Sequence, residues 1–171
     1  MDNFVSGWYL IYTRPKHEKK VSAGLRDLGI DHLLPTLRTL RTWCDRKKFI
    51  DAPMFPSYIF VHLKTRHDYL EALGTEGTLC YIKFGNEVAM VRDNIINNLR
   101  LVLQSGQDIE VSHVRFNPGQ QLVIPEGVFT GLSCEVVEHK NEHKLIVRIN
   151  LLNTNVLASL PGNIAYCAQA S

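Results

Sequence analysis

Residues 57–63 alternate in a way that predicts a β-strand with two apolar faces. Successive side chains of a strand point to opposite sides, so Tyr58 and Phe60 would lie on one face and Ile59 and Val61 on the other. A strand in a sheet with one solvated side needs only one apolar face. The second face therefore requires a covering partner, either helices of this chain or another molecule.

Residues 7–13 have the same property, since Trp8-Tyr9-Leu10-Ile11-Tyr12 is apolar on both faces. We predict that this segment pairs with residues 57–63. Such pairing would place Tyr12 near Phe55, Tyr58 and Phe60 and would gather aromatic rings on one face of the sheet.

Strand and helix signals alternate over residues 1–106, which predicts an α/β sandwich. Pro15 suits the first position of a helix that Gly29 ends, Thr65 and Asp68 approximate a capping box before a second helix, and Asp93 can cap a third. The remaining predicted elements are strands at 31–36, 79–84 and 87–91 and an extended hairpin or loop at 38–50.

From residue 116 the pattern changes to strict alternation with glycines at turn positions, which predicts a small all-β unit over 116–171 after a polar linker at 107–115. Leu145, Val147 and Ile149 would face inward. Five short strands, at 121–124, 133–138, 144–149, 155–160 and 164–167, fit an SH3-like barrel.

The sequence contains no recognisable catalytic motif, so we expect a binding protein rather than an enzyme. A net charge of +2 is too small to prove nucleic-acid binding by itself, and no nucleophile with an adjacent base, phosphate loop or paired-carboxylate motif stands at a recognisable spacing. His139 and His143 have the spacing of metal ligands on a helix, but the residues between them predict a turn, so we expect no metal and no cofactor. The chain lacks a signal peptide and a membrane span, so we expect a cytoplasmic protein with no membrane partner.

Basic residues gather at two places. The first group surrounds the predicted start of the first helix and consists of Arg14, Lys16, His17, Lys19 and Lys20. A rotation of about 100° per residue would bring Lys16 and Lys20 together. The second group flanks Trp43 in the predicted hairpin and consists of Arg38, Arg41, Arg46, Lys47 and Lys48. Such clusters suit phosphates, and an exposed ring suits an unpaired base; a solvated charged face and a Trp43 anchored to its own domain are the alternatives.

The ordered set of motifs resembles the NusG-type transcription elongation factors, including the RfaH-like and UpxY-like antitermination factors. The motifs are Trp8-Tyr9-x-x-Tyr12 with the basic helix after it, Phe55-Pro56-x-Tyr58-x-Phe60-Val61, Lys83-Phe84-Gly85 and Gly127-x-Phe129-x-Gly131. The resemblance implies an α+β chain. Its amino-terminal NGN-type α/β sandwich, an antiparallel sheet with three helices, would span 1–106, and its KOW-type SH3-like β-barrel would span 116–171.

The resemblance also implies partners. Tyr12, Phe55, Pro56, Tyr58 and Phe60 would bind the clamp helices of RNA polymerase, with Thr65, Arg66 and His67 near the opposite lobe. Arg14, Lys16, His17, Lys20, Trp43, Arg46 and Lys47 would contact the non-template DNA strand, while Gly127, Phe129 and Gly131 would form the KOW turn. The protein would act as a monomer that suppresses pausing or termination.

The order Trp43-Cys44-Asp45-Arg46-Lys47-Lys48 is most similar to the UpxY-type factors of capsular-polysaccharide operons, which favours a specialised role. Glu76 departs from the RfaH pattern, where a basic residue stands beside the DNA surface. A general NusG, whose barrel would bind Rho or a small-subunit ribosomal protein, is one alternative. A ribosome-associated or RNA-binding KOW protein is the other.

Overall fold

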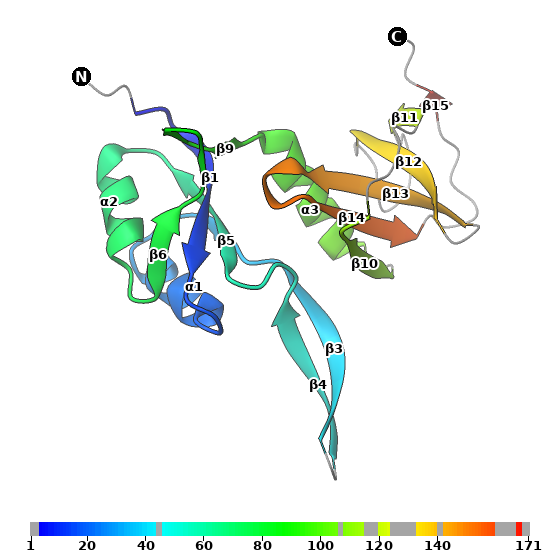
Figure 1. Cartoon of the computed structure of the whole chain (residues 1–171), viewed down its shortest axis with the longest axis horizontal. Coiled ribbons are helices and arrows are strands. Elements are labelled where there is room, and N and C mark those ends of the chain that lie inside the picture. Colours follow the sequence, from blue (N-terminus) through cyan, green and yellow to red (C-terminus); the bar gives the residue numbers. More distant parts are fainter. Residues whose placement is uncertain are drawn as a thin grey trace. The chain divides into compact units, whose positions relative to one another are not determined.

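The computed structural model describes two compact units, residues 1–92 and 93–171, and we consider each by itself (Figure 1). The described residues are 4–43, 46–105, 108–114, 120–123, 133–139, 142–159 and 167–168. The expected domain limits, 1–106 and 116–171, stay a prediction.

The first unit is built on an antiparallel sheet in which β1 is central. Its strands are β1 (Gly7–Thr13), β2 (His32–Leu33), β5 (Tyr58–Leu63), β6 (Thr78–Tyr81) and β9 (Met90–Val91). The order is β2-β5-β1-β6, with β9 also paired to β1. Tyr12 is the direct partner of Tyr58, and Leu10 is the partner of Phe60. The predicted pairing of the two doubly apolar strands is confirmed.

Two helices cover one face of this sheet, as Figure 1 shows: α1 (Glu18–Asp27) and α2 (Arg66–Gly74). They bury an apolar stripe because Val21 and Leu25 recur at helical spacing on α1 and Ala72 lies on α2. These side chains pack on the strand residues that alternate toward them, which are Tyr9, Ile11, Ile59, Val61, Leu63 and Tyr81. The core of the first unit therefore lies between the helices and this face.

Helix α1 begins later than the sequence predicts. Lys16 has a left-handed φ of 65°, and the helix starts at Glu18 with His17 as its N-cap residue. A non-glycine residue at positive φ cannot continue a right-handed helix, so Pro15 and Lys16 belong to the preceding loop. The predicted helical face that joined Lys16 to Lys20 is therefore wrong, whereas the predicted end at Gly29 is close to the observed one.

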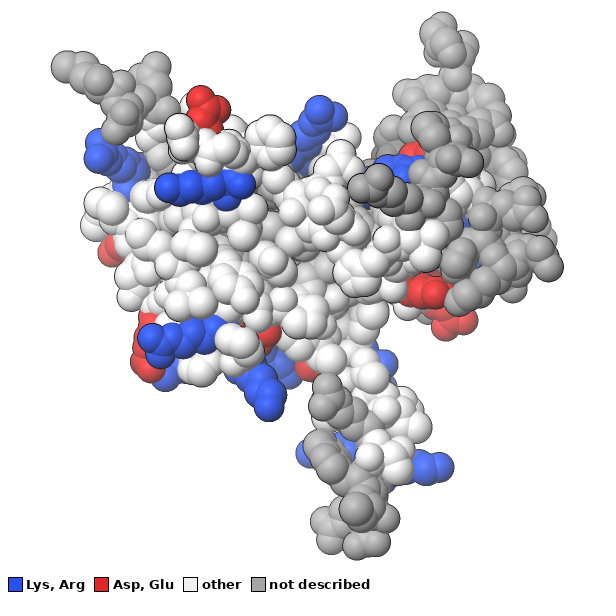
Figure 2. Space-filling view, in the orientation of Figure 1, with Lys and Arg blue, Asp and Glu red and all other residues white. Residues whose placement is uncertain are grey.

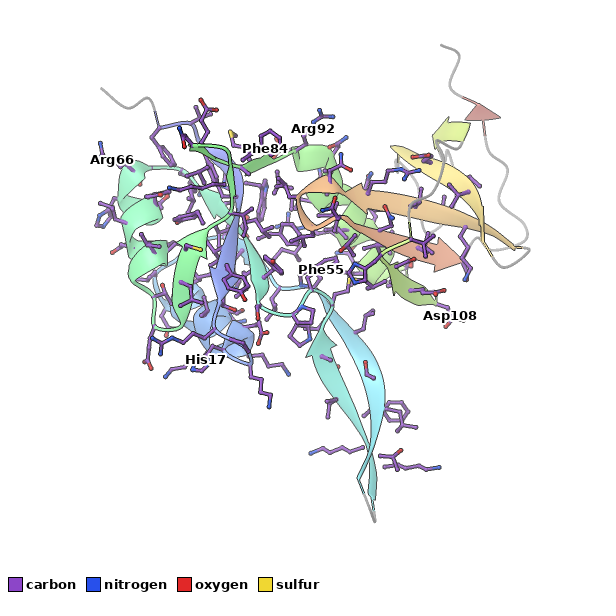
Figure 3. All side chains as sticks on the ribbon, viewed as in Figure 1. His17, Phe55, Arg66, Phe84, Arg92 and Asp108 are labelled. Atoms are coloured by element: carbon purple, nitrogen blue, oxygen red, sulfur yellow. The ribbon has the colours of Figure 1, made fainter. Side chains whose placement is uncertain are left out.

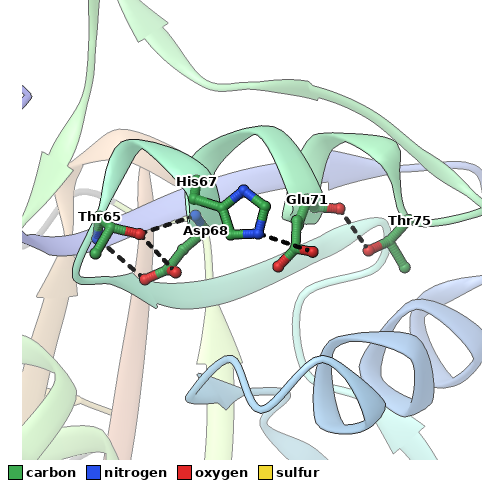
Figure 4. Close-up of polar contacts among 5 residues, drawn as sticks. All are labelled: Thr65, His67, Asp68, Glu71 and Thr75. Carbon is green, nitrogen blue, oxygen red and sulfur yellow. Dashed lines mark hydrogen bonds and ion pairs between the residues drawn. The ribbon is translucent and has the colours of Figure 1, made fainter.

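The predicted capping box of α2 is confirmed (Figure 4). The Asp68 backbone N–H donates to the Thr65 hydroxyl at 3.1 Å, and the Asp68 carboxylate accepts from the Thr65 backbone N–H at 3.0 Å. Hydrogen bonds from the Thr65 hydroxyl and the Lys64 and Thr65 backbones hold the pKa of Asp68 below its usual value. The start of α2 is thus fixed by local contacts.

The described residues of the segment 38–50, which are 38–43 and 46–50, lie in a hairpin, one of the two forms predicted for the segment. Strands β3 (Thr36–Trp43) and β4 (Arg46–Pro53) form a separate two-stranded sheet, which Figure 1 shows extending away from the sheet of the first unit. The predicted strand at 31–36 is shorter, since β2 ends at Leu33. The predicted strands at 79–84 and 87–91 are divided, because β7 (Lys83–Phe84) and β8 (Glu87–Val88) form their own small sheet.

The second unit contains helix α3 (Asp93–Gln104) and an antiparallel sheet in the order β10-β14-β13-β12-β11-β15. The strands are β10 (Ile109–Ser112), β11 (Gln120–Val123), β12 (Ser133–His139), β13 (Glu142–Ile149), β14 (Thr154–Ser159) and β15 (Cys167–Ala168), and a short helix η1 (Asn150–Leu152) precedes β14. Strand β10 lies within the expected linker and pairs with β14. Closure of this sheet into a barrel stays a prediction.

The alternation of β13 places Leu145, Val147 and Ile149 in the interior, as predicted. Arg148, between them, donates to both carboxylate oxygens of Glu135 at 2.7 Å, and this pairing raises the pKa of Arg148. His139 ends β12 and Glu142 begins β13, in line with the predicted turn between two strands.

Among the residues that the structure describes, no helix is long and apolar enough to cross a membrane. No three His, Cys, Asp or Glu residues within the same ranges are grouped so that they could hold a metal ion.

Candidate functional site

The sheet of the first unit has a second face, opposite α1 and α2, which we call the aromatic face. Strand alternation places Trp8, Leu10 and Tyr12 of β1 on it, together with Tyr58, Phe60 and His62 of β5. Trp8 and His62 are direct partners, with ring centroids 5.2 Å apart. The two strands thus gather four aromatic residues and a histidine on one surface.

Tyr12 and Tyr58 form the more accessible end of the aromatic face. Their ring centroids lie 5.3 Å apart with an interplanar angle of 52°, and both residues are half-buried. Pro56, just before β5, is exposed. The predicted proximity of Tyr12 and Tyr58 is therefore confirmed, and an apolar ring pair remains within reach of another molecule.

Phe55 and Phe60, by contrast, are buried. Their exposed fractions are 4% and 0%. The turn before β5 brings Phe55 edge-on to Phe60, with centroids 6.0 Å apart and an interplanar angle of 83°. This contact covers part of both rings. Of the five residues that the resemblance assigns to the clamp helices, Tyr12, Pro56 and Tyr58 keep accessible surface.

A buried carboxylate holds the turn before β5. Glu18, the first residue of α1, accepts a hydrogen bond of 2.7 Å from the backbone N–H of Ser57 and is 5% exposed. The Ser57 carbonyl accepts from the Thr13 N–H at 2.8 Å, and Ser57 itself has a φ of 69°. These contacts keep a strained turn in place and connect the end of β1, the start of α1 and the loop that carries Pro56.

The basic group near α1 divides between a loop and a helix. Arg14 and Lys16 are exposed in the loop, His17 is half-buried with its Nδ1 3.1 Å from the Pro15 carbonyl, and Lys20 lies in α1. The Lys20 ammonium lies 2.5 Å from the Glu76 carboxylate, which holds the pKa of Glu76 below its usual value. Glu76 therefore offsets part of the positive charge here.

The first turn of α2 exposes Thr65, Arg66 and His67. The His67 Nε2 lies 3.2 Å from a Glu71 carboxylate oxygen, one helical turn further on (Figure 4). Figure 3 shows Arg66 and His17 at opposite ends of the first unit. The structure thus does not bring the predicted sets near α1 and α2 together; it presents them at separate places.

Arg66 also borders a pocket of about 690 Å³ in the first unit. Its lining includes Phe4, Tyr9, Tyr69, Val88 and Met90. Burial, with a smaller contribution from the nearby Tyr69, raises the pKa of Tyr9, whose hydroxyl donates to the Val5 carbonyl. The pocket is therefore lined by aromatic and aliphatic side chains together with one cation, Arg66, and one carboxylate, Glu87.

The hairpin carries the second basic group. Lys47 is exposed on β4, and Figure 2 shows blue Lys and Arg side chains along this arm. Trp43 and Arg46 are direct partners at the last described rung of the hairpin, but their side chains lie outside the described residues. The predicted KOW turn, Gly127, Phe129 and Gly131, also lies outside the described residues.

Sequence reasoning did not single out Glu18 or Phe49. Glu18 is the lone carboxylate inside a run of cations, and that isolation is the signal that it has a specific partner. Phe49 is 55% exposed on β4, and the Arg38 guanidinium lies 4.7 Å from its ring centroid. An aromatic residue directly after Arg46, Lys47 and Lys48 in a predicted hairpin was its available signal.

Among solved structures, the chain resembles one described as "Domain interaction in Thermotoga maritima NusG", with a TM-score of 0.46 and 18% identity over 91% of this chain and 94% of that one. It also matches "Crystal Structure of MjSpt4:Spt5 complex conformation A", with a TM-score of 0.31 and 12% identity over 95% and 99% of the two chains.

Among curated proteins, the chain is 23% identical over 171 residues to the "Transcription termination/antitermination protein NusG" of Streptococcus pyogenes serotype M3 and of serotype M1. Each alignment covers 94% of this chain and 95% of the relative. Residues 6–100 match the family model described as "Transcription termination factor nusG". That match extends over more than half of the sequence, so this chain belongs to the NusG family of transcription termination and antitermination factors.

Proposed function

We propose that this chain is a transcription elongation and antitermination factor that binds the clamp helices of RNA polymerase through Tyr12, Pro56 and Tyr58. The observation that carries the proposal is the half-buried Tyr12–Tyr58 pair beside an exposed proline. Aromatic rings that keep part of their surface accessible are frequent anchors of protein interfaces. Phe55 and Phe60 belong to the same surface as buried support for the two tyrosines.

The proposed mechanism is binding without chemistry. The first turn of α2, with Thr65, Arg66 and His67, contacts the lobe of the polymerase opposite the clamp, so the factor bridges the cleft. Exposure of these three residues supports this contact. A ligand that binds the closed clamp better than the open one shifts the equilibrium toward the closed form and suppresses pausing.

The basic residues are proposed to contact the non-template DNA strand. Arg14 and Lys16 are exposed ahead of α1, and Lys47 is exposed on the hairpin, which supports phosphate contacts from two places. His17, Lys20, Trp43 and Arg46 complete the proposed set. Lys20 contributes less than the other cations because Glu76 pairs with it.

A specialised role at particular operons, such as those for polysaccharide synthesis, is the form we favour, because the hairpin carries five Lys or Arg and only two Asp between residues 36 and 53. The general NusG role is the second candidate, favoured by the 95% coverage of the S. pyogenes relatives. In either form the second unit, with the turn at Gly127, Phe129 and Gly131, would bind Rho or a small-subunit ribosomal protein, and the factor would act as a monomer.

Co-purification with RNA polymerase tests the proposal. Tyr58→Ala should reduce retention of polymerase by at least tenfold, while Phe84→Ala should leave it unchanged. Phe84 is a matched control because it is also aromatic and 82% exposed, and it lies on β7, outside the aromatic face (Figure 3). Equal retention by both variants would refute the assigned surface.

Chromatin immunoprecipitation mapped beside polymerase distinguishes the two roles. A specialised factor should occupy a few operons, and a general factor should follow polymerase over all transcribed genes. Co-sedimentation with ribosomes in the absence of polymerase would instead favour a ribosome-associated protein.

A further inference from the structure

The β3–β4 hairpin carries an apolar step in the middle of one face. Leu40 and Phe49 are direct cross-strand partners, so their side chains lie on the same face of the ladder. Their exposed fractions are 47% and 55%. They do not belong to the apolar core that α1 and α2 cover. The step is therefore not needed to complete that core.

Cations lie on both sides of this step. On the same face of the hairpin, the next pair toward its base is Arg38 with Asp51, and the next pair toward its tip is Thr42 with Lys47. The Arg38 guanidinium carbon lies 4.7 Å from the centroid of the Phe49 ring, which is the geometry of a cation–π contact. One face thus presents, in order, the Arg38–Asp51 pair, the Leu40–Phe49 step and the Thr42–Lys47 pair, all of them exposed.

We propose that the Leu40–Phe49 step is a stacking site for an unpaired nucleobase, with Arg38 and Lys47 on the adjacent phosphates. This inference rests on the nucleic-acid contact proposed above. It adds that Phe49 makes the hairpin prefer a single strand over a duplex. An exposed ring inside a basic groove is the arrangement with which proteins bind single strands of any sequence, because every base has a flat face.

Charge and size argue for this occupant. Residues 36–53 carry five Lys or Arg against two Asp, so a second copy of the same hairpin would be repelled. Two apolar side chains are also far smaller than the roughly 800 Å² per partner that a stable protein interface buries. In a duplex the bases are stacked on each other and the phosphates face the protein, so the ring would find no base there. A single strand offers phosphates to the cations and an unstacked base to the ring.

Binding of oligonucleotides by the full chain tests the proposal. Fluorescence anisotropy would be measured with one labelled single strand and with its duplex, over a series of salt concentrations. The variants are Phe49→Ala, Phe49→Tyr, Lys47→Ala and, as the matched aromatic control outside the hairpin, Phe84→Ala. Circular dichroism would verify that each variant is folded.

Phe49→Ala should weaken single-strand binding by roughly tenfold, since loss of one aromatic stacking contact weakens binding by roughly fivefold to a hundredfold. It should leave duplex binding and the salt slope unchanged, because the cations remain. Phe49→Tyr should bind as the unaltered chain does, and so should Phe84→Ala. Lys47→Ala should lower the salt slope for the single strand by about 0.7, the value for one lost phosphate contact.

Other outcomes would overturn the stacking site: no measurable oligonucleotide binding at low salt, no effect of Phe49→Ala, or an equal loss for single strand and duplex. Retention of polymerase by Phe49→Ala separates this site from the aromatic face. It should equal that of the unaltered chain, and its loss would assign Phe49 to a protein contact instead. If Tyr58→Ala retained polymerase while Phe49→Ala lost single-strand binding, the polymerase surface would fail and the stacking site would stand.

Discussion

The ring of Tyr12 lies 5.3 Å from the ring of Tyr58, and the two residues are direct partners in the β1–β5 ladder. Each ring therefore orients the other, and a partner protein that uses one contacts the pair. In a double-mutant cycle, Tyr12→Ala and Tyr58→Ala should each weaken polymerase binding, and the double variant should lose less than the sum of the two free energies. Strict additivity, measured by titration of purified polymerase, would contradict the shared surface.

Phe60→Ala should destabilise the first unit. Phe60 is 0% exposed and packs against Phe55, so truncation removes apolar contacts and leaves a cavity. We expect a loss of about 3–5 kcal/mol in the free energy of unfolding, the usual cost of truncating a buried phenylalanine. Chemical denaturation would measure it. A loss below about 1 kcal/mol would contradict the burial of this ring.

Removing the carboxylate of Glu76 should strengthen nucleic-acid binding. Glu76→Gln removes the partner of Lys20, whose Nζ lies 2.5 Å from the Glu76 carboxylate. Because both side chains are exposed, the gain in affinity for a single strand at low salt should reach at most roughly fivefold, and it should decline as salt screens the charges. The unfolding midpoint should not move. Unchanged affinity at low salt would exclude Lys20 from the contact.

The capping box of α2 should give the first unit a small pH dependence. Thr65→Ala should cost about 1 kcal/mol at pH 7, as the loss of an N-cap side chain usually does. The pKa of Asp68 is lowered in the folded state, so its contribution to stability is complete above the ordinary aspartate pKa and is lost as the pH falls through the lowered one.

The matched control for this pH dependence is Asp68→Asn, which cannot ionise. The difference in unfolding free energy between it and the unaltered chain should be constant above about pH 5 and should shrink below about pH 4. Urea denaturation at each pH measures the difference. A difference that does not change with pH would contradict the ionised cap.

Local patterns predicted the features that depend on neighbouring residues. The pairing of β1 with β5 followed from two strands that are apolar on both faces, and the Thr65–Asp68 capping box followed from residue types three positions apart. The hairpin followed from a polar stretch between two apolar runs. Each of these signals lies within one element or its direct neighbour.

Features that depend on distant contacts were not predictable. The left-handed φ of Lys16 shortens α1, and no glycine marks that position. The turn before β5 is held at Ser57 by Glu18, which belongs to another element. Strand β10 forms in a polar stretch because Ile109 pairs with Ala158, which is far away in the sequence. In these last two cases the deciding partner lies outside the local pattern.

The hydrogen bond from Ser57 to the Glu18 carboxylate has a consequence for recognition of a composite target. It joins the segment that presents Pro56 to the helix that follows the Arg14–Lys16 loop. Two binding surfaces therefore have their mutual spacing set before any ligand arrives. Such preorganisation spares the entropy of ordering one surface relative to the other, which would favour simultaneous binding of the proposed polymerase and DNA partners.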